Sequence, residues 1–476
     1  MQQELISTWH SSIRNHPSTA TDVPSYWSSD PSILRSTSTL SSFVVGTGSS
    51  LYTNLRPLLE STEHELILVT CFWARSETLC SLCTILRNLS NKALSRDTTI
   101  RVRLCFSSLS LFQKLFHTRS LDGHVYSPDV WSTRLGLPDQ HELRGLDLQI
   151  KSTFVLPFSV MHPKFMIMDR QTVVLPSCNV SWEDWFEGAV VMNGEVVGHF
   201  FRFWESFWVR SREMGMGMNG CEDPDPVAEM QYRTNQDSTA DTLLPKQVDL
   251  GPSDVQTVFL PSPHHVNPYF RPFPWQNTAT PPRTPLNEFL LAVMRKAQKN
   301  IYIQTPNLTA PPVLSALLQT LRRGVDVRIL TSERLMILEQ LVTAGTTTSR
   351  CVNRLIKRYQ AEKQISTDPS SRDRLLEEGE GVDIGRLKIE YYQPRSNHVE
   401  SRGRACAEPV QSHLKLTIAD DELVILGSGN LDRASWYTSQ ELGVAFFSSE
   451  LASTVQQTLG HALATRKRTV FDSSTP

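Results

Sequence analysis

The sequence has no long apolar segment and almost no net charge. Its 476 residues include 47 Lys and Arg against 49 Asp and Glu, a formal net charge of -2. No apolar run approaches the roughly 18 residues that a membrane-spanning helix needs. The first residues, Met1 to Ser7, contain no basic stretch followed by an apolar one, so we expect no secretory signal. These absences argue against an integral membrane protein and against a general nucleic-acid binder, which needs a basic surface.

The cysteines and histidines lack the spacing of a disulfide framework or a zinc site. Among the eight cysteines, Cys80 and Cys83 are the only close pair, and no second pair or nearby His accompanies them. His264 and His265 are adjacent, but no acidic residue or Cys lies at metal-binding spacing. We therefore predict reduced thiols, no metal, no cofactor, and an intracellular protein that is cytoplasmic or peripheral on an internal membrane.

One short polar pattern occurs twice in the chain. In each copy a His is followed by one residue, a Lys, four residues and an Asp, and then, after a short apolar stretch, by Ser-x-Asn. All five pairs of matched residues have the same offset of 251 positions. The matched residues are His162, Lys164, Asp169, Ser177 and Asn179 in the first copy and His413, Lys415, Asp420, Ser428 and Asn430 in the second.

The residues between these polar positions predict two buried strands joined by a turn in each copy, because they are apolar and partly branched. Residues i and i+2 of a strand share a face, so the His and the Lys of each copy point the same way. An imidazole beside an ammonium suits a phosphate better than a metal ion. A single His-x-Lys is most often structural, with a hydrogen-bonded core His, but five matched positions favour a functional site.

The repeat extends beyond the polar pattern and predicts the domain organisation. Residues 65–70 match 300–305 as apolar strands ending in Thr, and a helix and a further strand follow in both copies. We predict an α/β fold with two lobes related by a pseudo-twofold axis, each a mixed β-sheet flanked by helices, with the active site between them. The expected segments are an irregular N-terminal arm at 1–40, a first lobe at 41–211, a linker at 212–250, a second lobe at 251–467 and a tail at 468–476.

Two helical segments have unusual compositions. Residues 196–209 contain six Phe and Trp residues. Such a helix can lie on a membrane, but its position matches residues 451–464 of the second copy, so we predict a core helix. Residues 336–361 also predict a helix, with a weak point at the Thr-rich stretch 344–349.

These patterns resemble the signature of the phospholipase D superfamily, a paired His-x-Lys-x4-Asp motif followed by Gly-Ser-x-Asn. The second copy fits closely from Gly427 through Trp436 to Glu441. Residues 303–306 and 323–328 are similar to the cardiolipin synthase and phosphatidyltransferase branch in particular. The resemblance covers most of residues 40–210 and 253–465.

The resemblance implies a metal-independent, two-step displacement at a phosphodiester through a phosphohistidine. By analogy His162 is the nucleophile and His413 the general acid, although the sequence alone does not separate the two roles. Asp169 and Asp420 are expected to orient the imidazoles. The remaining matched residues are expected to bind the phosphoryl oxygens: Lys164, Lys415, Ser177, Asn179, Ser428 and Asn430.

The first copy departs from the family pattern in two places. Pro176 replaces the Gly of the Gly-Ser turn, which fixes φ there and is expected to narrow the phosphate pocket. The supporting carboxylate that follows the Asn is Glu441 in the second copy, but the first copy offers both Glu183 and Glu187, of which we favour Glu187. Cys178 lies between Ser177 and Asn179, so we expect a thiol at the mouth of the site that thiol reagents modify.

The leading functional hypothesis is a phospholipase D-type phosphodiesterase or phosphatidyltransferase acting on a phospholipid or a related phosphodiester. The choice between hydrolysis and transfer, the head group and the oligomeric state stay open. The expected partners are the phospholipid substrate and a membrane surface contacted peripherally. The alternatives are a nuclease of the same superfamily and a catalytically silent phosphate-binding scaffold.

Overall fold

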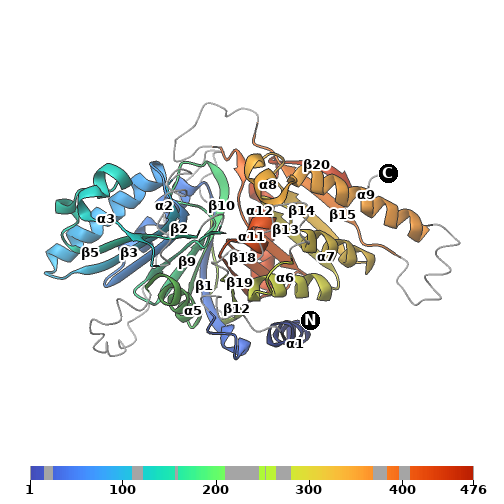
Figure 1. Ribbon diagram of the computed structural model, residues 1–476, viewed down its shortest axis with the longest axis horizontal. Helices are drawn as coiled ribbons and strands as arrows, with labels where there is room; N and C mark the ends of the chain where they lie inside the picture. Colours follow the sequence, from blue (N-terminus) through green and yellow to red (C-terminus); the bar gives the residue numbers. More distant parts are fainter. Residues whose placement is uncertain are drawn as a thin grey trace.

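A mixed β-sheet with helices on both faces forms the body of the protein (Figure 1). The computed structural model describes residues 2–15, 25–109, 122–155, 159–209, 246–251, 254–263, 280–367, 383–395 and 408–474. The predicted α/β class with a mixed sheet is confirmed.

The first half of the chain forms one side of this sheet. The strands pair in the order β5-β3-β2-β8-β9-β10-β1, of which β5, β3 and β2 are mutually parallel and the others antiparallel. Leu66 to Val69 of β2 are buried on both sides, as expected for a strand covered on both faces. The strands are β1 (Arg35–Gly46), β2 (Glu65–Phe72), β3 (Ile100–Ser108), β5 (Leu146–Ser152), β8 (Phe165–Met168), β9 (Thr172–Pro176) and β10 (Trp185–Asn193).

The second half repeats the same strand order. Its strands pair as β15-β14-β13-β17-β18-β19-β12. Residues 35–39 of β1 pair antiparallel with residues 254–258 of β12, which joins the two halves into one continuous sheet. The strands are β12 (Asp254–Ser262), β13 (Asn300–Thr305), β14 (Asp326–Thr331), β15 (Leu387–Tyr392), β17 (Leu416–Ala419), β18 (Leu423–Gly427) and β19 (Glu441–Phe447).

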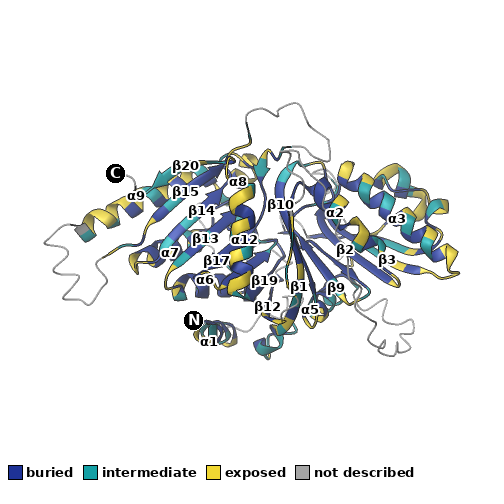
Figure 2. Cartoon of the chain, turned by 180° about the vertical axis from the view of Figure 1, so that it is seen from behind, coloured by how far each residue is buried: buried dark blue, intermediate teal, exposed yellow. Residues whose placement is uncertain are grey.

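Several of the helices begin at side-chain caps, and most of the helices bury an apolar face against the sheet, with α8 as an exception described below (Figure 2). Thr47, Ser76, Thr284 and Ser448 each accept a hydrogen bond from the backbone N–H three residues on, which satisfies a donor that the first turn leaves free. The helices are α2 (Gly48–Glu60), α3 (Glu77–Ser95), α5 (Val196–Trp204), α6 (Pro285–Lys296), α7 (Pro311–Arg322), α8 (Ile337–Ala344), α9 (Thr348–Thr367), α11 (Arg433–Tyr437) and α12 (Ser449–Ala462).

The N-terminal arm is not irregular as predicted. Residues Gln2–Arg14 form helix α1, which buries Leu5, Trp9 and Ile13 against α6. The Trp9 indole N–H donates to the Pro285 carbonyl at 3.0 Å. The spacing of these apolar residues is helical and was readable in the sequence, but the Ser- and Thr-rich composition around it favoured a loop.

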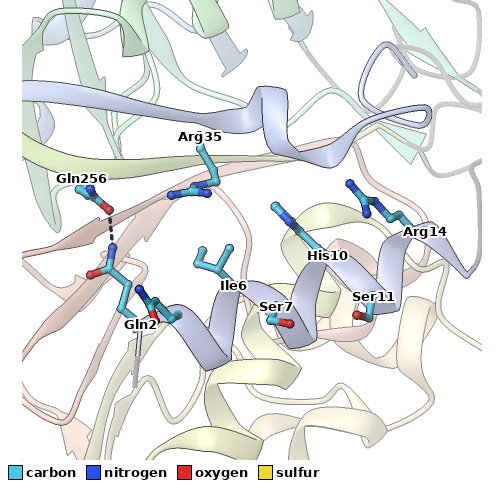
Figure 3. A pocket seen from close by; sticks show the side chains of 9 residues that line it. Gln2, Ile6, Ser7, His10, Ser11, Arg14, Arg35 and Gln256 are labelled. Atoms are coloured by element: carbon cyan, nitrogen blue, oxygen red, sulfur yellow. Dashed lines mark hydrogen bonds between the residues drawn. The ribbon is translucent and has the colours of Figure 1, made fainter.

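A groove of about 570 Å³ lies between α1 and the strands β1 and β12 (Figure 3). His10 and Arg14 of α1, with Arg35 and Gln256 of the strands, are among the residues that line it. No residue of the repeated polar motif lines this groove. It is therefore separate from the candidate site described below.

The predictions of an unstructured linker at 212–250 and a tail at 468–476 are also partly wrong. Lys246–Asp249 form strand β11, which pairs with β1, and Lys467–Asp472 form strand β20, which pairs with β15. Residues 212–245 of the predicted linker lie outside the described residues, as do His264 and His265.

The two unusual helical segments fold as core and as surface, respectively. Residues 196–209 form α5 and one further turn, and all of their Phe and Trp side chains except Phe201 are buried, which confirms the prediction of a core helix. The predicted helix 336–361 is interrupted at Gly345, where φ is 63°, and becomes α8 and α9. Among the described helices none is long and apolar enough to cross a bilayer.

Candidate active site

The two polar motifs meet because each begins beside a strand of the opposite half. The backbone N–H of His162 donates to the Gln440 carbonyl at 3.0 Å, and the backbone N–H of Gln440 donates to the Val160 carbonyl at 2.9 Å. In the second motif the backbone N–H of His413 donates to the Phe186 carbonyl at 2.9 Å. Residues 411 and 412 pair with residues 185 and 186 of β10 in the same way. Each motif His is thereby placed next to the residue that precedes a Glu of the other half.

Those two Glu residues hold the imidazoles. His162 Nδ1 lies 2.9 Å from Glu441 Oε2, and His413 Nδ1 lies 2.8 Å from Glu187 Oε1. A carboxylate at Nδ1 favours the tautomer that carries its proton there, which leaves the Nε2 lone pair available. Glu187 rather than Glu183 is the residue of the first half that contacts a motif His.

The two motif serines support these carboxylates and do not face a phosphate site as predicted. Ser177 Oγ donates to Glu187 and accepts from the Gly188 N–H at 2.9 Å. Ser428 Oγ donates to Glu441 Oε2 at 2.5 Å and accepts from the Leu442 N–H at 3.1 Å. The single O–H of each serine is therefore already used. The prediction that Ser177 and Ser428 bind phosphate is wrong.

The two motif aspartates lie away from the imidazoles, so their predicted orienting role is also wrong. The Asp169 carboxylate accepts from the N–H groups of residues 63–65 at 2.7 to 2.8 Å. Asp420 accepts from those of residues 298–300 at 2.7 to 3.2 Å. Each Asp stands five residues beyond its Lys, about 16 Å along an extended strand, and therefore at its far end. There the Asp169 carboxylate binds the backbone at the start of β2, and the Asp420 carboxylate binds the backbone at the start of β13.

The two motif lysines are buried and turned back toward their own motif. Lys164 Nζ donates to the His162 carbonyl at 2.9 Å, and Lys415 Nζ donates to the His413 carbonyl at 2.7 Å. Lys164 is 0% and Lys415 4% exposed. Burial and the nearby Lys164 charge lower the pKa of Lys415 to about 7. Two buried ammonium groups that repel each other favour the binding of an anion between them.

The two His–Glu pairs differ in their titration. Burial lowers the pKa of His162 to about 4, and it lowers the pKa of His413 well below its usual range, aided there by the Lys415 and Lys164 charges. Burial acts to raise the pKa of Glu441, but the His162 charge and the hydrogen bonds from His162 and Ser428 lower it to about 2. Burial raises the pKa of Glu187 to about 7 despite the Lys415 charge.

The two motif asparagines and Cys178 complete the predicted set. Asn179 Oδ1 accepts from the Phe72 N–H at 3.4 Å. Asn430 Nδ2 donates to Asp432 at 3.1 Å, and Asn430 Oδ1 is buried without a hydrogen-bond partner. Cys178 is only 4% exposed, and burial raises the pKa of its thiol. The expectation of a reactive thiol at the mouth of the site is therefore wrong.

Three further residues belong to this neighbourhood: Trp185 and Ser435, which were not predicted, and Glu183, the alternative to Glu187 as the supporting carboxylate. The Trp185 ring lies 4.6 Å from the His413 ring, centroid to centroid, and covers it with an apolar surface. Ser435 Oγ donates to Glu441 Oε1 at 2.7 Å. Burial raises the pKa of Glu183 to about 7. Trp185 and Glu183 lie between the motif Asn and the supporting Glu, a segment that is three residues shorter in the first copy than in the second, so the repeat gives no partner position for them.

Comparison with known proteins supports the resemblance that the paired motifs predicted. Residues 290–463, which include the second motif, match the family model described as cardiolipin synthase, PLD-like domain. No curated protein matches the chain.

Two solved structures are similar to the chain at low sequence identity, and the first of them shares its fold. The crystal structure of phosphatidylserine synthase from Haemophilus influenzae Rd KW20 has a TM-score of 0.50 and 14% identity, covering 90% of this chain and 87% of that chain. A phospholipase D family member, Nuc from Salmonella typhimurium, has a TM-score of 0.25 and 19% identity over 39% of this chain and 90% of its own. The predicted resemblance to the phospholipase D superfamily is confirmed, since residues 290–463 are similar to the cardiolipin synthase, PLD-like domain family and the phosphatidylserine synthase structure shares the fold.

Proposed function

We propose that the protein is a phospholipase D-type phosphodiesterase or phosphatidyltransferase that acts on a phospholipid through a phosphohistidine. The observation that supports this proposal best is the crossed pair of His–Glu contacts, His162 with Glu441 and His413 with Glu187. Each imidazole is fixed through Nδ1, and both Nε2 atoms are left for chemistry. The two buried ammonium groups beside them supply a binding site for one phosphodiester anion.

The reaction follows in two steps. In the first, the His162 Nε2 lone pair attacks phosphorus, the bond from phosphorus to the leaving alcohol breaks, and His413 gives that alcohol a proton. In the second, His413 takes a proton from water or from a second alcohol, whose oxygen attacks phosphorus. The phosphorus–nitrogen bond then breaks and His162 regains its lone pair. Water gives hydrolysis, and an alcohol gives transfer.

The titration of the two pairs supports this division of roles. Glu441 and His162, with pKa values of about 2 and about 4, hold no dissociable proton beyond the one on Nδ1 near neutral pH, so His162 is a neutral nucleophile. Glu187, with a pKa of about 7, keeps a proton in its pair with His413 up to neutral pH. A phosphodiester anion bound beside His413 attracts that proton toward the imidazole, which prepares it as the general acid.

The lysines and asparagines would stabilise the charge that develops on the non-bridging oxygens. An ammonium has three N–H groups, and Lys164 and Lys415 each use one on the carbonyl of the motif His. The others are available to phosphoryl oxygens, and donors of this kind, placed in a buried site, usually supply the largest catalytic term. Asn179 and Asn430, in the turn that follows the second strand of each motif, would donate their side-chain N–H groups to the same oxygens.

The test is the capture of the covalent intermediate. The protein is mixed with phosphodiesters that include phosphatidylcholine, phosphatidylglycerol and single-stranded DNA, quenched in base and examined by mass spectrometry for a phosphoadduct. We expect an acid-labile adduct on His162 from a phospholipid, and its absence in His162→Asn and in no-substrate controls. An adduct from DNA alone would replace this proposal with a nuclease. Equal turnover by wild type and His162→Asn would remove the proposed chemistry.

A further inference from the structure

Exposed apolar side chains gather on α8 and on two segments beside the motifs. Of the ten large apolar residues that are exposed in the described part of the chain, seven lie at these places, so they are not the scattered apolar residues of an ordinary surface. Leu338 is 76% and Trp182 67% exposed. The seven residues are Met336, Ile337, Leu338, Leu341, Val342, Trp182 and Val410.

Helix α8 has its polar side inward and its apolar side outward. At 100° per residue, Ile337, Leu338, Leu341 and Val342 share an arc of about 140° on the helix surface. The residue that α8 buries is Gln340, whose side chain donates to the Leu335 carbonyl at 2.5 Å and accepts from the Thr348 N–H at 2.6 Å. A surface helix of a water-soluble domain normally shows the reverse arrangement.

This face lies next to the candidate site. Ser332, which precedes α8, donates its hydroxyl to the Ser412 carbonyl at 3.1 Å, and Ser412 is followed directly by His413. At its other end α8 contacts α11, where Arg433 Nη1 donates to the Thr343 carbonyl at 3.4 Å.

Trp182 of the first half and Val410 of the second half lie in segments that contact each other through β10. The Val410 N–H donates to the Asp184 carbonyl at 2.8 Å, and Gln411 pairs with Trp185 of β10. Residues 410–413 therefore connect the segment of Trp182 to the segment that leads into α8. The segments that carry the exposed apolar groups are thus connected through the residues that lead into His413.

Charged residues frame the apolar arc. Arg334 precedes α8 and is exposed, Arg433 contacts its last turn, and Arg350 is exposed in the first turn of α9. Two acidic residues are also present, Glu339 on α8 itself and Glu333, which forms an ion pair with Arg468 at 3.1 Å. An apolar arc with arginines at both ends matches a lipid surface with anionic head groups.

From this arrangement we infer that α8, with Trp182 and Val410, is the surface by which the protein docks on a phospholipid bilayer. This inference rests on the proposed function. The substrate is then an amphiphile whose acyl chains stay in the bilayer while its phosphodiester reaches His162, whose side chain is only 14% exposed. Docking α8 at head-group level brings the site to the phosphodiester without extracting the lipid.

The test compares two double variants of the full chain that make the same change at different places. Leu338→Glu/Leu341→Glu adds two carboxylates to the apolar arc. The matched control is Leu94→Glu/Ile365→Glu, since Leu94 on α3 and Ile365 near the end of α9 are also exposed, 42% and 50%. Ile365 stands 17 residues beyond the start of α9, about 25 Å along that helix. All four positions face solvent, so both variants are expected to fold.

Binding is measured by flotation with phosphatidylcholine vesicles and with vesicles of equal phosphatidylcholine and phosphatidylglycerol. We expect wild type and control to bind, more strongly to the anionic vesicles, and the α8 variant to bind at least about tenfold more weakly, since burying one Leu contributes about that factor. Equal binding by all three proteins, or none by wild type, would overturn the inference. Loss of a dimer rather than of vesicle binding would make α8 an interface between copies, and would overturn it also.

Turnover separates this inference from the function on which it rests. With bis(p-nitrophenyl) phosphate, a soluble phosphodiester, the α8 variant is expected to match wild type, whereas on vesicles its rate is expected to fall with its binding. A wild type that binds vesicles but cleaves neither substrate refutes the proposed function and leaves the docking surface standing. A variant that is equally active on vesicles refutes the docking surface alone.

Discussion

Replacing Glu441 by Gln tests whether the carboxylate acts on the reaction through His162. When His162 attacks phosphorus its ring becomes positively charged, and Glu441 Oε2 lies 2.9 Å from Nδ1. The low pKa of Glu441, about 2, means that it is ionised when the charge develops. Two unit charges about 4 Å apart attract each other by about 4 kcal/mol at an effective dielectric constant of about 20. Glu441→Gln keeps a hydrogen-bonding side chain and removes this attraction, so we expect formation of the phosphohistidine to slow about 10³-fold.

The assay is a rapid-quench measurement of the phosphoadduct on His162 in a single turnover, with substrate in excess of its Kd. Glu422→Gln is the matched control, since Glu422 is exposed in the turn between β17 and β18. Thermal unfolding of both variants checks that they are folded. A loss of less than about tenfold in the adduct rate for Glu441→Gln, with the fold intact, would show that Glu441 only packs against His162 and would refute the electrostatic reasoning.

Three further predictions concern the pH profile, the motif aspartates and the buried thiol. The pH dependence of kcat/KM is expected to rise through about 4, where His162 loses its proton, and to fall above about 7, where the Glu187–His413 pair and Lys415 each lose a proton. Glu187→Gln removes one of these two groups, so the upper limb should become less steep by one proton, and a limb of unchanged slope would contradict the assignment of a proton to the Glu187–His413 pair. Asp420→Ala leaves three backbone N–H groups without their acceptor, so we expect the free energy of unfolding, measured by urea denaturation, to fall by about 3 kcal/mol. The rate per folded molecule is expected to stay near that of wild type. A large loss of rate in the folded protein would restore a catalytic role for Asp420. Under native conditions iodoacetamide is expected to label exposed Cys80 and to spare Cys178, with activity retained, as peptide mapping would show; rapid labelling of Cys178 would contradict its burial.

The parts of the fold that could be predicted from the sequence are those with local periodicity. The apolar strands of each motif and the core helix at 196–209 follow from the spacing and composition of neighbouring residues. Helix α1 differs from the predicted irregular arm because the Ser- and Thr-rich composition around it is typical of a loop, although Trp9 and Ile13 have helical spacing. Strands β11 and β20 were missed because short edge strands with polar residues have little periodicity of their own.

The candidate site was predicted as a set of residues but not as a set of contacts. The repeat identified both His–Lys pairs, yet the prediction put the motif aspartates beside the imidazoles as their orienting groups. The structure instead places a Glu of the opposite half there, 279 positions away for His162 and 226 for His413. One sequence without relatives shows no signal for a contact at such separation, because strand pairing between the halves decides it. A motif is therefore informative about which residues matter and silent about which partners hold them.

The crossing of partners between the halves also explains why each copy of the motif is insufficient alone. His162 depends on Glu441 for its tautomer, and Glu441 is held by Ser428 of its own copy. His413 depends on Glu187, which is held by Ser177. Either half by itself therefore contains a His without its carboxylate and a Ser–Glu pair without its His. The two crossed partners meet different surroundings, since Glu441 is ionised and Glu187 titrates near 7, so a symmetric sequence pattern yields two imidazoles with unequal protonation. That inequality is what a two-step displacement needs, because one imidazole must be unprotonated when the other holds the proton.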